Sequence, residues 1–208
     1  HLLRLLDRAF GRFTSPNGYF PPRLAPQVQG GIVAKKKPLS QIHFCLGTRG
    51  LAQNHSDRYV AYTLNTLLGG GVSSRLFQQV RENRGWVYSI YSVLSSFKDA
   101  GLFSVYAATS LETAFKAIRL VLKEIKQVKQ KGMGTAELNK AKGHMKGSLM
   151  LNLESTNSRM SRLAKQELYF GSFFSLDEML SAIDAVGEEE VQALIHRLLD
   201  EEQLSMLT

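Results

Sequence analysis

Residues 67–88 read LLGGGVSSRLFQQVRENRGWVY, and the rest of the chain is organised around this stretch. Apolar residues at helical spacing lead into it, and they are followed by Gly69, Gly70 and Gly71. Glycine commonly ends a helix because it adopts the positive φ angle that the exit requires. The glycines therefore predict the end of one helix and a turn.

A short second helix is expected after this turn. Ser74 is of a residue type that caps helix N-termini, and residues 76–80 carry apolar side chains at helical spacing. Gly85 is expected to break the helix, and a strand is expected to follow it. Arg81, near the helix C-terminus, and Tyr88, near the strand start, are therefore predicted to lie close together.

Alternating apolar and polar residues predict strands on both sides of this stretch. The expected strands cover residues 30–36, 41–47, 87–96, 102–109 and 204–207, and the turn at 97–101 joins two of them as a hairpin. Amphipathic helices are expected at 2–10, 57–69, 111–131, 135–153, 157–170, 176–183 and 188–199. This order predicts an α+β fold, with a largely antiparallel sheet covered by helices on one face.

The composition excludes several classes of protein. The chain has 208 residues, of which 44% are hydrophobic, and this is ordinary for a globular core. No run of about 18 apolar residues occurs, so no membrane span is predicted. The net charge is +8, but the cations are scattered and accompany no nucleic-acid motif, so a solvated surface is favoured over nucleic-acid binding. The single cysteine, Cys45, fits a reducing compartment.

The central stretch also carries a family pattern, GGGVSSRL at residues 69–76 followed by RENRGWVYS at 81–89. With it, the chain resembles the second half of the insulinase/pitrilysin-type zinc peptidases, the superfamily that includes mitochondrial processing peptidase. The resemblance continues through DAGLF at residues 99–103 and covers nearly the whole chain. It implies the metallohydrolase half-domain fold of the processing-peptidase type.

The same resemblance implies a domain division and a partner. Residues 1–27 would be the tail of a preceding half plus a proline-rich linker, and residues 28–208 the C-terminal peptidase-like domain. The expected partner is a homologous zinc-bearing half, on the same chain or in a separate subunit. A peptide substrate, a dimer, and a cytoplasmic or organelle-matrix location complete the expectations.

By the resemblance, Arg81 and Tyr88 are the candidate catalytic residues, projecting across an internal chamber toward the zinc of the other half. A peptidase needs donors aimed at the oxyanion that forms on the scissile carbonyl, and both side chains can supply them. From the residues alone, a surface ion pair for Arg81 and packing for Tyr88 remain open. The expected substrate-binding residues are the three glycines, as a loop facing the chamber, and Ser74.

The zinc motif of the family, His-x-x-Glu-His, is missing from this sequence. Its five histidines are isolated, without a second histidine or a glutamate at the required offsets. No cofactor is therefore expected in this chain, zinc is expected in the partner half, and the chain alone is predicted to be inactive.

Two functions are therefore considered. The first is the substrate-binding and transition-state-stabilising half of a zinc metalloendopeptidase that degrades or processes peptides in an enclosed chamber. The second is a catalytically inactive structural or partner subunit of the same fold. The presence of both Arg81 and Tyr88 favours the first.

Overall fold

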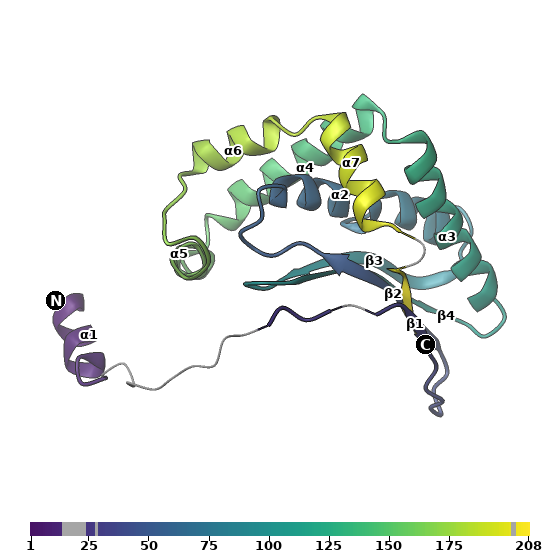
Figure 1. Ribbon diagram of the computed structural model, residues 1–208, viewed down its shortest axis with the longest axis horizontal. Helices are drawn as coiled ribbons and strands as arrows, with labels where there is room; N and C mark the ends of the chain where they lie inside the picture. The colour runs from purple at the N-terminus through teal and green to yellow at the C-terminus, as the bar shows by residue number, and fades with distance from the viewer. Residues whose placement is uncertain (14–23, 28, 201–202) are drawn as a thin grey trace.

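The computed structural model describes residues 1–13, 24–27, 29–200 and 203–208, so most of the predicted linker lies outside the described residues. The helices are α1 (Leu2–Phe10), α2 (Arg58–Gly69), the π-helix η1 (Phe77–Glu82), α3 (Ala114–Lys131), α4 (Thr135–Asn152), α5 (Thr156–Phe170), α6 (Leu176–Asp184) and α7 (Glu188–Leu198). The strands are β1 (Gly31–Val33), β2 (Ile42–Gly50), β3 (Val87–Ser96), β4 (Gly101–Thr109) and β5 (Ser205–Leu207) (Figure 1).

The strands form one five-stranded sheet in the order β1-β5-β2-β4-β3. Strands β3 and β4 are the predicted hairpin, whose turn is closed by a hydrogen bond of 2.8 Å from the Phe97 N–H to the Ala100 carbonyl. Strand β2 pairs antiparallel with β4, and β5 pairs antiparallel with β2 but parallel with β1. The predicted α+β fold with a largely antiparallel sheet is confirmed.

Helices α2 to α7 lie on one face of the sheet, and the opposite face is open (Figure 1). Burial alternates along the strands, as the period of two requires. On β2, for example, Phe44 is buried under the helices whereas His43 is exposed. Helix α2 contributes Leu64 and Leu68 to the same core. Helix α1 stands apart from this body, and all of its residues are exposed.

Two predicted strands differ from the observed ones by more than one residue at an end. The strand expected at 30–36 is limited to Gly31–Val33, because only these residues pair with β5. The strand expected to end at residue 47 continues to Gly50, opposite Gly101. A side chain on Gly50 would put its Cβ 2.7 Å from the Leu102 nitrogen, so glycine permits this close approach.

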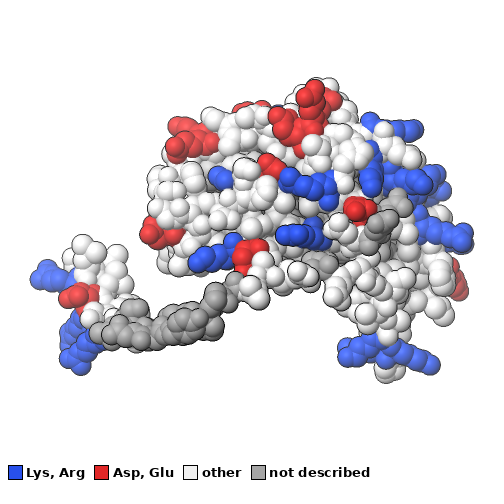
Figure 2. All heavy atoms as spheres, viewed as in Figure 1, with Lys and Arg blue, Asp and Glu red and all other residues white. Residues whose placement is uncertain are grey.

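The charges are mixed over the surface. Lys and Arg gather over α3 and at the segment that joins β1 to β2, whereas Asp and Glu gather over α6 and α7 (Figure 2). Lys123, Lys126 and Lys131 of α3 are exposed, in agreement with the solvated surface favoured for the scattered cations. Among the described residues, no helix is both long enough and apolar enough to cross a membrane.

Candidate functional site

The glycine turn has a different cause from the predicted one. Helix α2 ends at Gly69, and Gly70 follows with φ −81°, so the exit does not use a positive φ angle. Gly69 is required by packing instead, because a Cβ there would collide with the Ser92 backbone and lie 2.7 Å from Ser92 Oγ. A Cβ on Gly70 would lie 2.6 Å from the Thr66 Cα. Gly71 is free of such crowding, with His144 Nε2 nearest at 3.8 Å.

The segment after the glycines is braced against α4. Arg75 donates two hydrogen bonds to Glu137, from Nε at 2.9 Å and from Nη2 at 2.6 Å. These hydrogen bonds lower the pKa of the Glu137 carboxyl below its usual value. Ser74 is 3% exposed, and its buried Oγ has no hydrogen-bond partner in the described part of the chain, so the predicted side-chain cap is absent. The structure therefore places Ser74, which was predicted to bind substrate, beneath the surface.

The short helix predicted here is wound as a π-helix, with Asn83 N–H bonded to the Gln78 carbonyl five residues earlier at 2.9 Å. Leu76 and Val80 anchor it to the core, and neither has measurable exposure. Arg81 lies on its outer side, where the guanidinium carbon is 4.9 Å from the centre of the Phe77 ring. π-Helical turns are rare in proteins, and those that occur are often found at functional sites. The π-helical winding therefore makes this segment a candidate for a functional site.

The predicted break at Gly85 is confirmed. Gly85 has φ +63°, its N–H bonds the Arg81 carbonyl at 2.9 Å, and the Trp86 N–H bonds the Val80 carbonyl at 3.2 Å. The Gly85 bond to Arg81 is the single hydrogen bond of a left-handed (αL) helix C-cap, and the Trp86 bond reaches six residues back along the helix. The turn therefore sends the chain directly from η1 into β3.

Tyr88 occupies a β-bulge at the start of β3. Val87 pairs with Thr109 and Ser89 with Ala108, which leaves Tyr88 as the extra residue. Val87 and Ile90 are both buried, so Tyr88 and Ser89 lie between them on the open face, and Tyr88 is 58% exposed. Bulges are frequent beside active sites because they redirect a side chain.

Two threonines hold the approach to this bulge. Thr109 Oγ1 and Thr113 Oγ1 donate to the Trp86 carbonyl at 2.6 and 3.0 Å. No sequence pattern indicates these two threonines, or Glu137 as the partner of Arg75. Their roles depend on contacts across long separations, and a threonine at a strand end carries no distinguishing pattern.

Arg81 and Tyr88 thus come from two irregular elements joined by one tight turn. Within the described residues, neither the Arg81 guanidinium nor the Tyr88 hydroxyl has a hydrogen-bond or ion-pair partner; Arg81 stacks on Phe77, and Tyr88 is exposed. Both present free donors to solvent. A guanidinium and a phenol in this state can stabilise a developing negative charge.

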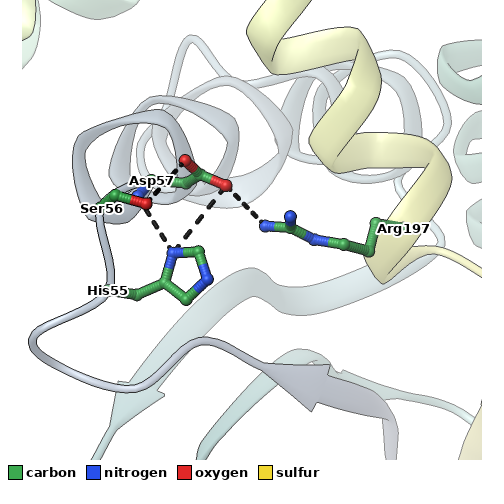
Figure 3. Close-up of polar contacts among 4 residues, drawn as sticks. All are labelled: His55, Ser56, Asp57 and Arg197. Atoms are coloured by element: carbon green, nitrogen blue, oxygen red, sulfur yellow. Dashed lines mark hydrogen bonds and ion pairs between the residues drawn. The ribbon is translucent and has the colours of Figure 1, made fainter.

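His55, Ser56 and Asp57 are the residue types of a catalytic triad, but their hydrogen bonds exclude that arrangement (Figure 3). Ser56 donates to Asp57 Oδ1 at 3.2 Å, and His55 Nδ1 accepts from the Asp57 backbone N–H at 3.0 Å. Arg197 of α7 donates to Asp57 Oδ2 at 2.7 Å, and this bond lowers the pKa of the Asp57 carboxyl. The cluster ties the start of α2 to α7.

The described residues do not fit a zinc site. They contain no group of three or more His, Cys, Asp or Glu side chains that could hold a metal ion. His43 Nδ1 instead lies 2.7 Å from the Tyr106 hydroxyl on the open face of the sheet. Cys45 is half-buried and forms no disulfide.

Comparison with known proteins identifies the family. The profile of the "Peptidase M16 inactive domain" matches residues 1–145. The chain belongs to the peptidase M16 family. Relatives of this M16 inactive domain include "Uncharacterized zinc protease YmxG" of Bacillus subtilis, 41% identical over 177 residues, or 85% of this chain and 43% of that protein. The relative "Probable mitochondrial-processing peptidase subunit alpha-1, mitochondrial" of Arabidopsis thaliana is 30% identical over 82% of this chain and 37% of that protein.

Solved structures share the fold of the M16 inactive domain. A peptidase M16 inactive domain from Pseudomonas fluorescens superposes with a TM-score of 0.82 at 23% identity, covering 92% of this chain and 46% of that one. A protease from Helicobacter pylori gives a TM-score of 0.86 at 19% identity, covering 99% and 51%. The chain spans less than half the length of the curated relatives described above. An M16 inactive half implies a partner half in this zinc protease family.

Proposed function

We propose that this M16 inactive domain is the substrate-binding and transition-state-stabilising half of a zinc metalloendopeptidase that processes or degrades peptides in an enclosed chamber. Its partner is a homologous zinc-bearing half, on the same chain or in another subunit. The proposal assigns the zinc to that half, and the part of this chain that the structure describes contains no group of three or more His, Cys, Asp or Glu side chains that could hold a metal ion.

One observation carries the proposal. Arg81 and Tyr88, the residues that match the family pattern, are exposed, and their donors are free within the described chain. A side chain kept only for structure is ordinarily packed or paired, as Arg75 is with Glu137. The π-helix and the β-bulge hold these two side chains with their donors free. Such donors suit a site that forms its hydrogen bonds only with the negative charge that develops in the transition state.

In this proposal each side chain has a separate role. The Tyr88 hydroxyl donates one hydrogen bond to the oxyanion of the tetrahedral intermediate. The Arg81 guanidinium offers charge and further donors to the same oxygen or to a neighbouring peptide carbonyl. Gly69, Gly70 and Gly71 form the wall beside the peptide, and a Cβ added to Gly71 would meet no atom closer than His144 Nε2 at 3.8 Å.

The experiment compares variants of the complete protein, with both halves present, on a quenched peptide library. Tyr88→Phe is expected to lower kcat/KM by about 10²–10³-fold, which is the effect of losing one oxyanion donor. Arg81→Gln is expected to give a loss of similar size. Tyr91→Phe is the matched control, because Tyr91 is an exposed tyrosine on the same strand and should keep its turnover. Unchanged turnover in Tyr88→Phe would reject the catalytic role.

The second candidate is a catalytically inactive structural or partner subunit of the same fold, and the description of the matching domain as inactive agrees with both candidates. In that case the complete protein would cleave no peptide, or its turnover would not change in Tyr88→Phe and Arg81→Gln. A loss of peptide cleavage in these two variants, with Tyr91→Phe unaffected, would exclude it. The first proposal also includes a dimer and a cytoplasmic or organelle-matrix location. It places the domain boundary at residues 27–28.

A further inference from the structure

A cavity of about 580 Å³ lies among α2, α4, α5 and α6, on the helical side of the sheet. Its size falls within the range of about 300–1,000 Å³ that is usual for small-molecule sites. Neither Arg81 nor Tyr88 lines it. The cavity is thus separate from the candidate peptidase residues, and the inference drawn from it does not depend on the proposed function.

Helix α5 turns its polar face toward this cavity. Arg162 and Gln166 line it, and Gln166 is the only buried residue of the helix. The apolar side chains Met160, Leu163 and Leu168 point to solvent, with exposures of 63%, 49% and 77%. A surface helix ordinarily does the reverse and buries its apolar stripe. The inversion gives the cavity a polar wall on one side.

The cations of the cavity lack anionic partners. Arg162 Nε is buried without a hydrogen-bond acceptor, and Arg162 Nη1 meets only the weak acceptor Met179 Sδ at 3.8 Å. Arg58 lies 4.7 Å from the Tyr59 ring centre and 4.9 Å from that of Phe170, without an ion pair in the described chain. Lys165 also lines the cavity.

No Asp or Glu is among the described residues that line the cavity. A desolvated guanidinium without an anion is costly, whereas a carboxylate accepts two parallel hydrogen bonds from it. The remaining wall is mostly apolar: Met145, Leu149, Leu153, Phe174, Met179 and Ile183. The rings of Tyr59 and Phe170 stack on the faces of the Arg58 guanidinium, so its N–H donors, which lie in the guanidinium plane, stay available at the rim of the cavity.

We propose that this cavity binds a small carboxylic acid that carries an apolar chain. The carboxylate pairs with Arg162, and Arg58 and Lys165 add positive charge. The apolar chain of the ligand lies along the apolar side chains of α4 and α6. The structure favours a carboxylate on an apolar body over a bare inorganic anion, because an inorganic anion would leave the apolar wall without a partner.

Isothermal titration of the full-length protein tests the proposal with three probes, each below its aggregation concentration: decanoate, decanol and acetate. Decanoate is expected to bind at least about tenfold more tightly than either, because decanol lacks the charge and acetate lacks the chain. Equal affinity for decanoate and decanol would overturn the carboxylate assignment. Equal affinity for decanoate and acetate would overturn the apolar subsite.

Variants locate the binding. Arg162→Gln is expected to weaken decanoate by about tenfold and to leave decanol unchanged, and the decanol titration thereby confirms an intact cavity. Arg159→Gln is the matched control, because Arg159 is exposed on the same helix and does not line the cavity. If Arg162→Gln does not fold, Lys165→Gln replaces it, with a smaller loss of decanoate affinity expected. Decanoate binding that no cavity variant weakens would refute the site.

Discussion

The substitution Gly69→Ala tests how α2 packs against β3. A Cβ on Gly69 would collide with the Ser92 backbone and lie 2.7 Å from Ser92 Oγ, which donates to the Asn65 carbonyl at 3.0 Å. The helix end would have to withdraw from the strand. Overpacking costs about 1–3 kcal/mol, and the weakened hydrogen bond costs about 1 kcal/mol. Alanine recovers at most about 1 kcal/mol of helix propensity, so the net loss is about 2 kcal/mol.

Urea unfolding followed by the fluorescence of Trp86, the only tryptophan of the chain, measures this loss. With a slope of roughly 2 kcal/mol per molar, the midpoint is expected to fall by about 1 M. Gly71→Ala is the matched control, because its nearest neighbour is 3.8 Å away and the change should stay within about 0.5 kcal/mol. Equal midpoints for the two variants would refute the packing argument.

Substitutions at three further positions probe the same framework by urea or thermal unfolding. Glu137→Gln removes the negative charge that pairs with Arg75, and the loss is expected to be about 1 kcal/mol at neutral pH because the pair is partly exposed. Since the fold lowers the pKa of Glu137, that stability is present above the ordinary carboxyl pKa and is lost as the pH falls through the lowered value; a difference that persists in strong acid would contradict it. Gly85→Ala should cost about 1 kcal/mol because φ is +63°, and Gly85→Asn should cost less; an equal cost would argue against the left-handed turn. Gly143→Ala, with open space inside α4, should raise stability by up to about 1 kcal/mol, and a decrease would mean that the helix is crowded there.

Most of the elements could be predicted from local patterns. The alternation in residues 102–109 and the helical stripe in 111–131 each reflect one repeating period, so β4 and α3 lie where expected. The predictions failed where distant residues decide the outcome. Strand β1 is short because its only partner is the three-residue β5, some 170 positions away along the chain.

The candidate site was predicted in identity but not in geometry. The family pattern selected Arg81 and Tyr88, and no local rule indicated that one would lie on a π-helix and the other in a β-bulge. Those irregularities arise because Val80, Val87 and Ile90 must all reach the same core. The π-helix, with its hydrogen bond across five residues, and the extra residue in the β3 bulge allow all three side chains to reach the core.

The sequence by itself determined the periodic elements, the helix break at Gly85 and the family, because each depends on residues close together in the chain. Only the tertiary structure decided why Gly69 must be glycine, which acid pairs with Arg75, and that Arg162 faces a cavity without a carboxylate. These three features are contacts between elements far apart in sequence. Their energies come from packing and desolvation in three dimensions, so they cannot be predicted from residues that are neighbours in the sequence.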